Sequence, residues 1–227
     1  MGNTDGRTPP IIDLDAYRKP RPVQRRPRRD EPVTLRVRVD LSYTEPPLWR
    51  RLELSSDLHL DEVHQVIQAS FGWTDSHLHR FGCGPSYYST KTVYYLCPFS
   101  ADDGDNGVPE EDVRLDEVLV KVGDKLFYEY DFGDSWLHLI TVEAVSERAQ
   151  SAPQAICTDG DRPGPAEDCG GVPGYELMVV ANDPDHPDHR EAREHFAAMY
   201  GADVEPQEWA PVPFDADRVN RLLAVDI

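Results

Sequence analysis

Hydrophobic and polar residues alternate where the folded part of the chain begins. The segment Val33–Tyr43, VTLRVRVDLSY, places a valine or leucine at every second position and mostly charged residues between them. A period of two is typical of a strand with one buried face. The turn Glu45–Pro47 and the apolar segment Leu48–Leu54, LWRRLEL, follow directly. We therefore predict an N-terminal β-hairpin.

The pattern changes to a helical period after the hairpin. Apolar residues recur at helical spacing from Leu60 to Phe71, and Asp61 and Glu62 lie in the first turn, where acidic side chains complement the helix dipole. We predict a helix that ends at Gly72.

The middle of the chain returns to alternation. His77–Phe81 predicts a third strand, and the acidic, apolar-poor residues 100–112 predict a surface loop. Residues 115–122 predict a short helix. The segment 128–138, YEYDFGDSWLH, predicts two strands joined by a turn at Asp131–Asp134.

The C-terminal third is mainly helical by the same criterion. Residues 146–165 contain several prolines and predict a long connection, after which helices are expected at Tyr175–Ala181, Asp188–Tyr200 and Asp215–Val225. A hairpin, a helix, further antiparallel strands and then helices predict a single α+β domain over residues 33–227.

Charge divides the chain into two parts. Its 227 residues carry a net charge of −19, yet residues 1–29 sum to +5 and the remainder therefore to −24. Residues 1–32 contain six prolines, and Arg18–Arg29 contains seven Lys or Arg and no acid. Such a segment buries too little apolar surface to offset the loss of chain entropy. We predict a disordered basic tail over residues 1–32.

The acidic folded region repels a phosphate backbone, so contact with nucleic acid is expected only through Arg18–Arg29. The same arginines could instead bind an acidic membrane, an acidic partner or the acidic surface of this chain. The four cysteines form no Cys-x-x-Cys pair and no secretory leader is evident, which favours free thiols in a reducing cytoplasm. No apolar run reaches the roughly 20 residues of a membrane-spanning helix.

Two segments carry the candidate chemistry, namely FYEYDFGDSWLHLITVE at 127–143 and EDCGGVPGY at 167–175. Together with two histidines of the predicted third strand, they supply the candidate ligand-binding residues. These residues are Asp131, Asp134, Trp136, His138, Glu167, Asp168, Cys169, His77 and His79.

One hypothesis for these residues is a divalent metal held by Asp131, Asp134 and His138. Carboxylate and imidazole ligands suit Zn, Mn or Fe better than Ca, and Glu167 with Cys169, or the two histidines of the third strand, could complete the shell. The spacing matches no known metal signature. The alternative is structural, with turn aspartates that accept hydrogen bonds from nearby backbone N–H groups.

Aromatic residues are dense around both segments, and either a ligand groove or a β-rich core would use them. The aromatic residues in or beside the motifs are Trp73, Tyr87, Tyr88, Tyr128, Tyr130, Phe132, Trp136 and Tyr175. Core packing is the more frequent cause, while Trp136 beside a turn is the best single candidate for a binding contact.

The glycine-rich segment EDCGG lacks a following Lys or Arg, and two acids precede it, so it would bind an anion poorly. We predict instead a helix entry that docks against the DFGD turn. Two adjacent carboxylates would raise the pKa of Cys169, which favours a buried thiol over a nucleophile.

The order of these motifs resembles the plasmid pRiA4b ORF-3-like family. Some members of that family are labelled TnpR-like passenger proteins of insertion-sequence elements. The resemblance covers about residues 33–225 and rests on LWRRLEL, SFGW at 70–73, HLHRF at 77–81, YEYDFGDSWLH at 128–138, EDCGG at 167–171 and VNRLL at 219–223. It implies an α+β fold and a plasmid or mobile-element context, without an established activity.

Serine-recombinase chemistry does not fit the sequence. That mechanism needs a nucleophilic serine among several arginines, whereas Ser135 lies between Asp134 and Trp136 in an acidic region. Two functions remain. The first is an accessory or binding protein for a peptide, protein or small ligand near the DFGD and EDCGG segments. The second is a metal-dependent hydrolase that uses Asp131, Asp134 and His138, with Glu167 as general base. A divalent metal is the one cofactor considered.

Overall fold

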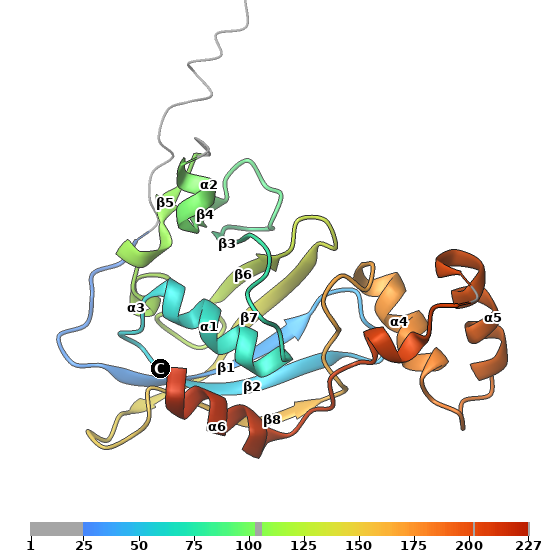
Figure 1. The fold of residues 1–227 in the computed structure, drawn as a ribbon. Coiled ribbons are helices and arrows are strands. Elements are labelled where there is room, and N and C mark those ends of the chain that lie inside the picture. The colour runs from blue at the N-terminus through green and yellow to red at the C-terminus, as the bar shows by residue number, and fades with distance from the viewer. Residues whose placement is uncertain (1–24, 103–105, 202, 227) are drawn as a thin grey trace, which may run out of the picture.

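The fold is built on a single mixed sheet. The computed structural model describes residues 25–102, 106–201 and 203–226, and its strands form one eight-stranded sheet in the order β5-β4-β3-β6-β7-β1-β2-β8 (Figure 1). Neighbouring strands are antiparallel except for β4 and β5, which are parallel. The strands are β1 (Val33–Leu41), β2 (Leu48–Ser55), β3 (His79–Cys83), β4 (Val93–Leu96), β5 (Val108–Pro109), β6 (Lys125–Tyr130), β7 (Trp136–Glu147) and β8 (Ala155–Asp161).

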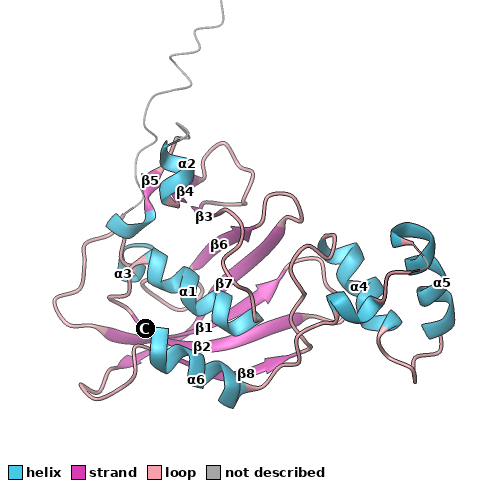
Figure 2. Ribbon diagram, viewed as in Figure 1, coloured by secondary structure: helices cyan, strands magenta, loops and turns pink. Residues whose placement is uncertain are grey.

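The helices cover one face of the sheet and extend beyond its edge. Helix α1 lies across the sheet, α6 runs beside it near β8, and α4 and α5 project to one side (Figures 1 and 2). None of the described helices is long and apolar enough to cross a membrane. The helices are α1 (Leu60–Phe71), α2 (Pro98–Asp102), α3 (Leu115–Val118), α4 (Gly171–Ala181), α5 (His189–Tyr200) and α6 (Ala216–Asp226), with 3₁₀ turns η2 (Glu110–Asp112) and η3 (Pro206–Trp209).

The core lies between α1 and the sheet. The alternation of β1 places Leu35, Val37 and Val39 in this core at 0–1 % exposure. The opposite face carries ion pairs such as Arg36 Nη2 to Glu53 Oε1 at 2.7 Å. The hairpin, the first helix and the α+β class predicted from the period of the sequence are all confirmed.

Two sequence-based predictions of loops are wrong in part. Residues 146–165 include strand β8, which pairs antiparallel with β2 although only Ala155 and Cys157 of the strand are buried, so its apolar signal is weak. Residues 100–112 include the end of α2, β5 and η2 as well as loop. Glu110 of this segment is 2 % exposed because it pairs with a histidine of the core.

The described end of the basic segment docks onto the protein itself. Residues 1–24 lie outside the described residues, but Arg26 donates its backbone N–H to Glu117 O at 3.0 Å, and Arg28 Nε lies 3.1 Å from Glu117 Oε2. Arg29 donates to Val120 O at 2.9 Å. The predicted disorder therefore does not extend to residues 25–32. Of the alternatives for these arginines, contact with the chain's own acidic groups is the one observed here.

Candidate functional site

The DFGD segment forms a tight turn between β6 and β7. Asp131 has φ of +52°, a left-handed conformation that aspartate tolerates better than most residues. Its Oδ1 accepts hydrogen bonds from the backbone N–H of Gly133 at 2.9 Å and of Asp134 at 3.3 Å. Ser135 Oγ donates to buried Glu129 at 2.9 Å. The predicted turn role of Asp131 is thus confirmed, and its second carboxylate oxygen, Oδ2, stays free of the turn.

The EDCGG segment packs directly against this turn, as predicted. Asp134 Oδ2 accepts a hydrogen bond from Gly170 N at 3.0 Å. Gly171 begins α4 with φ of +67°, and a Cβ at this position would lie 2.7 Å from the backbone oxygen of Asp134. The two segments therefore meet through backbone atoms at a distance that only glycine permits.

We expect Gly171→Ala to separate these segments and lower the free energy of unfolding. Gly123→Ala is a matched control, since Gly123 also has positive φ, +85°, but no atom lies within 4 Å of its added Cβ. Both substitutions should lower the free energy of unfolding by about 1 kcal/mol, because alanine is unfavourable at positive φ. Gly171→Ala should lower it by about 2 kcal/mol more, because its Cβ overpacks against Asp134. Urea unfolding of both variants measures the difference. Equal losses would show that the close approach of Gly171 to Asp134 is unimportant.

Three carboxylates surround one imidazole at this junction. His77 lies in the loop between α1 and β3, and its Nε2 is 3.1 Å from Asp168 Oδ1 and 3.8 Å from both Asp131 Oδ2 and Glu167 Oε2. Nε2 is buried and has no hydrogen-bond partner among the described residues. The structure thus unites four of the predicted site residues, drawn from three separate segments of the chain.

Glu167 is held in place by neutral groups. Its Oε1 accepts from Thr74 N at 2.9 Å and from Tyr130 OH at 3.0 Å, and Tyr130 OH in turn accepts from Ser76 N at 3.0 Å. Burial and the adjacent Glu167 raise the pKa of Tyr130, so its hydroxyl stays protonated and donates. Glu167 therefore joins the loop at 73–77 to strand β6, and none of the ion pairs among the described residues joins its carboxylate to a Lys or Arg.

The predicted metal set of Asp131, Asp134 and His138 is not assembled. His138 is fully buried in the core, where its ring packs against Phe71 and Trp73 and its Nδ1 lies 2.9 Å from Trp136 O. Burial lowers the pKa of His138 to about 3. Strand alternation directs His138 into the core, whereas Asp131 lies in the turn that follows the end of β6. The hydrolase based on these ligands loses its geometric basis.

Trp136, the best single candidate for a binding contact, lies in the core. Its side chain is 0 % exposed, and its indole N–H has no hydrogen-bond partner among the described residues. Cys169 is 2 % exposed, and burial together with Asp134 raises the pKa of its thiol to about 12. The expectation of a buried thiol with a raised pKa is confirmed. The other aromatic residues divide between core and surface, with Tyr88 and Phe132 exposed and Trp73, Tyr87, Tyr128, Tyr130 and Tyr175 buried.

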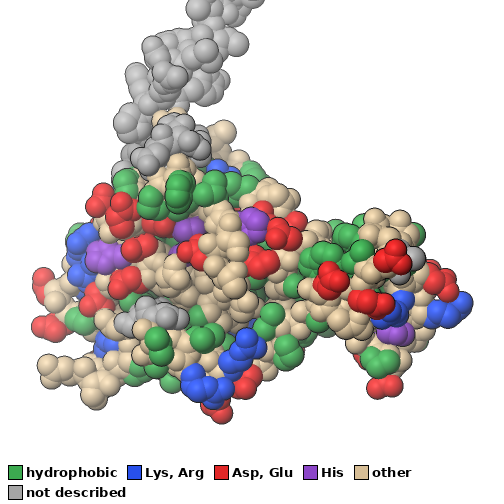
Figure 3. Space-filling view, in the orientation of Figure 1, with side chains coloured by type: hydrophobic (Ala, Val, Ile, Leu, Met, Phe, Trp, Pro, Cys, Tyr) green, Lys and Arg blue, Asp and Glu red, His purple; other side chains and the backbone are tan. Residues whose placement is uncertain are grey.

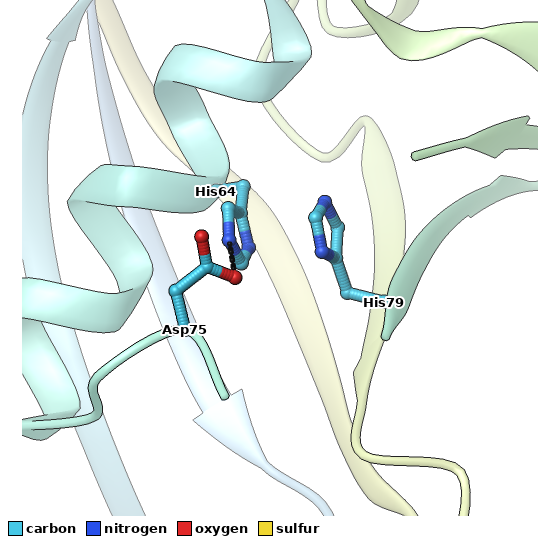
Figure 4. A group of neighbouring side chains, drawn as sticks. All are labelled: His64, Asp75 and His79. Atoms are coloured by element: carbon cyan, nitrogen blue, oxygen red, sulfur yellow. Dashed lines mark hydrogen bonds and ion pairs between the residues drawn. The ribbon is translucent and has the colours of Figure 1, made fainter. Parts of the chain in front are cut away.

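His79 does not share a site with His77, because β3 begins only at His79, which points to the core. There its ring stacks on that of His64 from α1, with centroids 3.5 Å apart and ring planes inclined by 4° (Figure 4). His79 Nε2 lies 2.9 Å from Glu110 Oε1. His64 contacts Tyr128 OH at 2.8 Å and Asp75 Oδ1 at 2.9 Å. Burial is the main cause that lowers the pKa of His64 to about 4.

Sequence reasoning missed His64, Asp75 and Glu110. A signal existed for His64, since it lies four residues after Leu60 and three before Ile67 and therefore on the apolar stripe of its helix. A histidine on such a stripe needs buried polar partners. Asp75 comes from a loop and Glu110 from the 3₁₀ turn η2, and the sequence does not indicate where either segment packs.

The comparison with known proteins decides the family. The family model described as plasmid pRiA4b ORF-3-like protein matches residues 33–220, which is most of the chain. The chain belongs to this family.

Similar proteins agree with this plasmid pRiA4b ORF-3-like assignment. An uncharacterized protein of Sinorhizobium fredii, y4hQ, is 33 % identical over 163 residues, which cover 70 % of this chain and 79 % of that protein. The crystal structure of MM3350, a protein of unknown function from Methanosarcina mazei Go1, has a TM-score of 0.61 and 27 % identity. The match covers 82 % of this chain and 97 % of the MM3350 chain. MM3350 thus shares the fold, and neither relative supplies an activity.

Proposed function

We propose that this plasmid pRiA4b ORF-3-like protein is an accessory binding protein of the cytoplasm that acts in a plasmid or mobile-element context. Its ligand is a peptide or small molecule that presents a positively charged group to the junction of the DFGD and EDCGG segments. The observation that carries this proposal is the convergence of Asp131, Glu167 and Asp168 on His77 Nε2.

The charge at this junction is unbalanced. None of the ion pairs among the described residues joins a Lys or Arg to Asp131, Glu167 or Asp168, whereas elsewhere acidic groups such as Glu143 and Glu176 pair with arginines at 2.7–2.8 Å. Asp and Glu side chains lie across the face drawn in Figure 3, with Lys and Arg mostly at its margins. A cation is therefore attracted to the junction and an anion repelled.

Two exposed apolar residues are adjacent in sequence to site residues. Leu78, next to His77, is 38 % exposed, and Phe132, next to Asp131, is 40 % exposed, with the Arg80 guanidinium 4.9 Å from the centroid of the Phe132 ring. Exposed apolar groups beside converging polar ones favour a ligand with an aliphatic part next to its charge, such as a lysine side chain or a polyamine. The groups are also fixed before a ligand arrives, because Asp131 and Glu167 are hydrogen-bonded to the backbone. Such prior ordering lowers the entropy lost on binding.

The test is a calorimetric titration of the full chain with spermidine and with a tetralysine peptide, in EDTA and about 0.15 M salt, which screens distant charges. We expect the double variant Glu167→Gln with Asp168→Asn to weaken binding by at least about tenfold, since each close charge contributes on the order of 1 kcal/mol. The matched control is Asp185→Asn with Asp188→Asn, which removes two exposed acids elsewhere.

Equal weakening in both double variants would mean that the cations respond only to the net charge of the chain. Failure of both probes to bind the unaltered protein would refute the proposal. The proposal would be supported if the Glu167 and Asp168 double variant weakens binding and the control double variant does not.

A further inference from the structure

We propose that this junction also binds a divalent transition metal, Zn²⁺ or Mn²⁺, held by His77 Nε2, Asp131 Oδ2 and Asp168 Oδ1. The inference rests on the proposed function and deepens it, because it adds a metal ion to the cations that the same carboxylates attract. These three groups are one of two sets among the described residues whose potential ligand atoms all lie within 4.8 Å of one another.

One atom of this set lacks the partner that a buried polar atom normally has. His77 Nε2 is inaccessible to solvent and accepts or donates no hydrogen bond among the described residues. A buried polar atom without a partner is unfavourable by about 1–3 kcal/mol. The side chain of Asp131 is 10 % exposed, and its Oδ1 accepts the hydrogen bonds of the turn while its Oδ2 faces His77 Nε2 at 3.8 Å. Coordination of one ion would give Nε2 a partner.

The distances suit an ion between these atoms. Zinc bonds of about 2.0–2.2 Å to nitrogen and oxygen place neighbouring ligand atoms of a tetrahedral site about 3.3–3.6 Å apart. His77 Nε2 lies 3.1 Å from Asp168 Oδ1 and 3.8 Å from Asp131 Oδ2. Asp168 is the movable member, since its side chain is 71 % exposed. A small rotation of that carboxylate admits an ion to Nε2 and then closes over it.

The donors and their supports also match a transition ion. One imidazole nitrogen with carboxylate oxygens suits Zn or Mn better than Ca, which prefers six to eight oxygens. Three protein ligands leave a position open for a further donor. Glu167 Oε2 lies 3.8 Å from His77 Nε2 and is held by Tyr130. Glu167 would orient a molecule bound to the ion without being required to bind the ion itself.

The second set, His64, Asp75 and His79, does not share these properties. Its two imidazole rings are stacked in parallel, so their in-plane lone pairs cannot point at a common ion without turning (Figure 4). Both nitrogens of His64 already have partners, and His79 Nε2 is paired with Glu110. This cluster is an internal hydrogen-bond network.

The experiment uses the full chain, stripped with EDTA and dialysed, and titrates it with Zn²⁺ alone and with Mn²⁺ alone by calorimetry. We expect one equivalent to bind. His77→Ala should weaken the affinity by more than about 100-fold, because loss of even a group that only supports a ligand weakens metal affinity by about 10–100-fold. Asp168→Asn should weaken it by at least about tenfold. His59→Ala is the matched control, since His59 also lies near a carboxylate, Glu62, at 3.6 Å, outside the junction.

The outcomes separate the two proposals. If Zn²⁺ and Mn²⁺ do not bind but spermidine or tetralysine still requires Glu167 and Asp168, the metal inference is overturned and the proposed function stands. If neither metals nor organic cations bind, both are overturned. If His77→Ala and His59→Ala bind the metal equally tightly, the ion lies elsewhere, and the inference is also overturned. Circular dichroism of each variant verifies that a loss of affinity is not a loss of fold.

Discussion

Lowering the pH from 7.5 to 5 is expected to reduce the free energy of unfolding by about 4 kcal/mol, through two buried histidines that contribute about 2 kcal/mol each. Burial lowers the pKa of His138 to about 3 and that of His64 to about 4. In the unfolded chain both groups have the ordinary histidine pKa of about 6.5. The unfolded state therefore binds more protons between about pH 6.5 and 3, and stability falls as the pH falls through this window.

Two other effects oppose this acid-induced loss of stability. Burial raises the pKa of Glu110, which takes up a proton more readily in the folded chain than in the unfolded one. Partial neutralisation of the net charge of −19 also reduces repulsion. Both act mainly nearer the pKa range of carboxyl groups, so the histidine effect should dominate between pH 7.5 and 5.

Urea unfolding at pH 7.5, 6 and 5 measures the change. His138→Leu conserves volume in an apolar surrounding and should remove about half of the acid-induced loss, about 2 kcal/mol. His195→Leu is the control, because His195 is exposed. An acid-induced loss of the same size in His138→Leu and in the unaltered protein would show that His138 does not titrate between the two states as described.

Trp136→Ala is expected to lower the free energy of unfolding by about 4 kcal/mol, in the range for removal of a large aromatic side chain from a core. Trp136 is 0 % exposed, and its ring lies 6.0 Å from that of Trp73 between centroids. A cavity at this position also removes support from the turn at Asp131, since Trp136 begins β7 and pairs with Tyr130 at the end of β6. Denaturant unfolding provides the measurement.

Trp136→Phe separates two causes of the effect. It keeps an aromatic ring and removes the indole N–H, which has no hydrogen-bond partner among the described residues. Removal of an unpaired donor relieves about 1–3 kcal/mol of desolvation penalty, which offsets part of the lost packing. We expect a net loss below about 1.5 kcal/mol. A loss close to that of Trp136→Ala would indicate a partner for the N–H, and weaker spermidine binding would return Trp136 to the ligand site.

The sequence predicted the fold wherever one face of an element is apolar. The alternation of Val33–Tyr43 and the helical period of Leu60–Phe71 both corresponded to observed elements. Strand β8 gave little signal, because it is an edge strand in which only Ala155 and Cys157 are buried. Where backbone hydrogen bonds are the main contacts of a strand, its hydrophobic pattern does not indicate which strand it pairs with.

The sequence predicted all four residues of the junction, but it grouped them with residues that the structure places in the core. Adjacent acids and glycines marked Asp131, Glu167 and Asp168, and the docking of EDCGG on the turn followed from the glycines. The position of His138 depends on which face of β7 meets α1, and that face is set by the register with β6 and β1. His77 joins the carboxylates because the strand begins two residues later than predicted. One residue of register decides between a ligand and a core side chain.

The junction also lies where the chain leaves the sheet for the projecting helices. Glu167 and Asp168 belong to the link between β8 and α4, while Asp131 and His77 belong to the sheet and its loop. A ligand bound both by the β8–α4 link and by the sheet would therefore hold helices α4 and α5 in place against the sheet. A bound ligand would then lower the rate at which α4 and α5 separate from the sheet and would slow proteolysis around residues 162–170. Protease resistance of this segment would report the presence of the ligand in a cell extract.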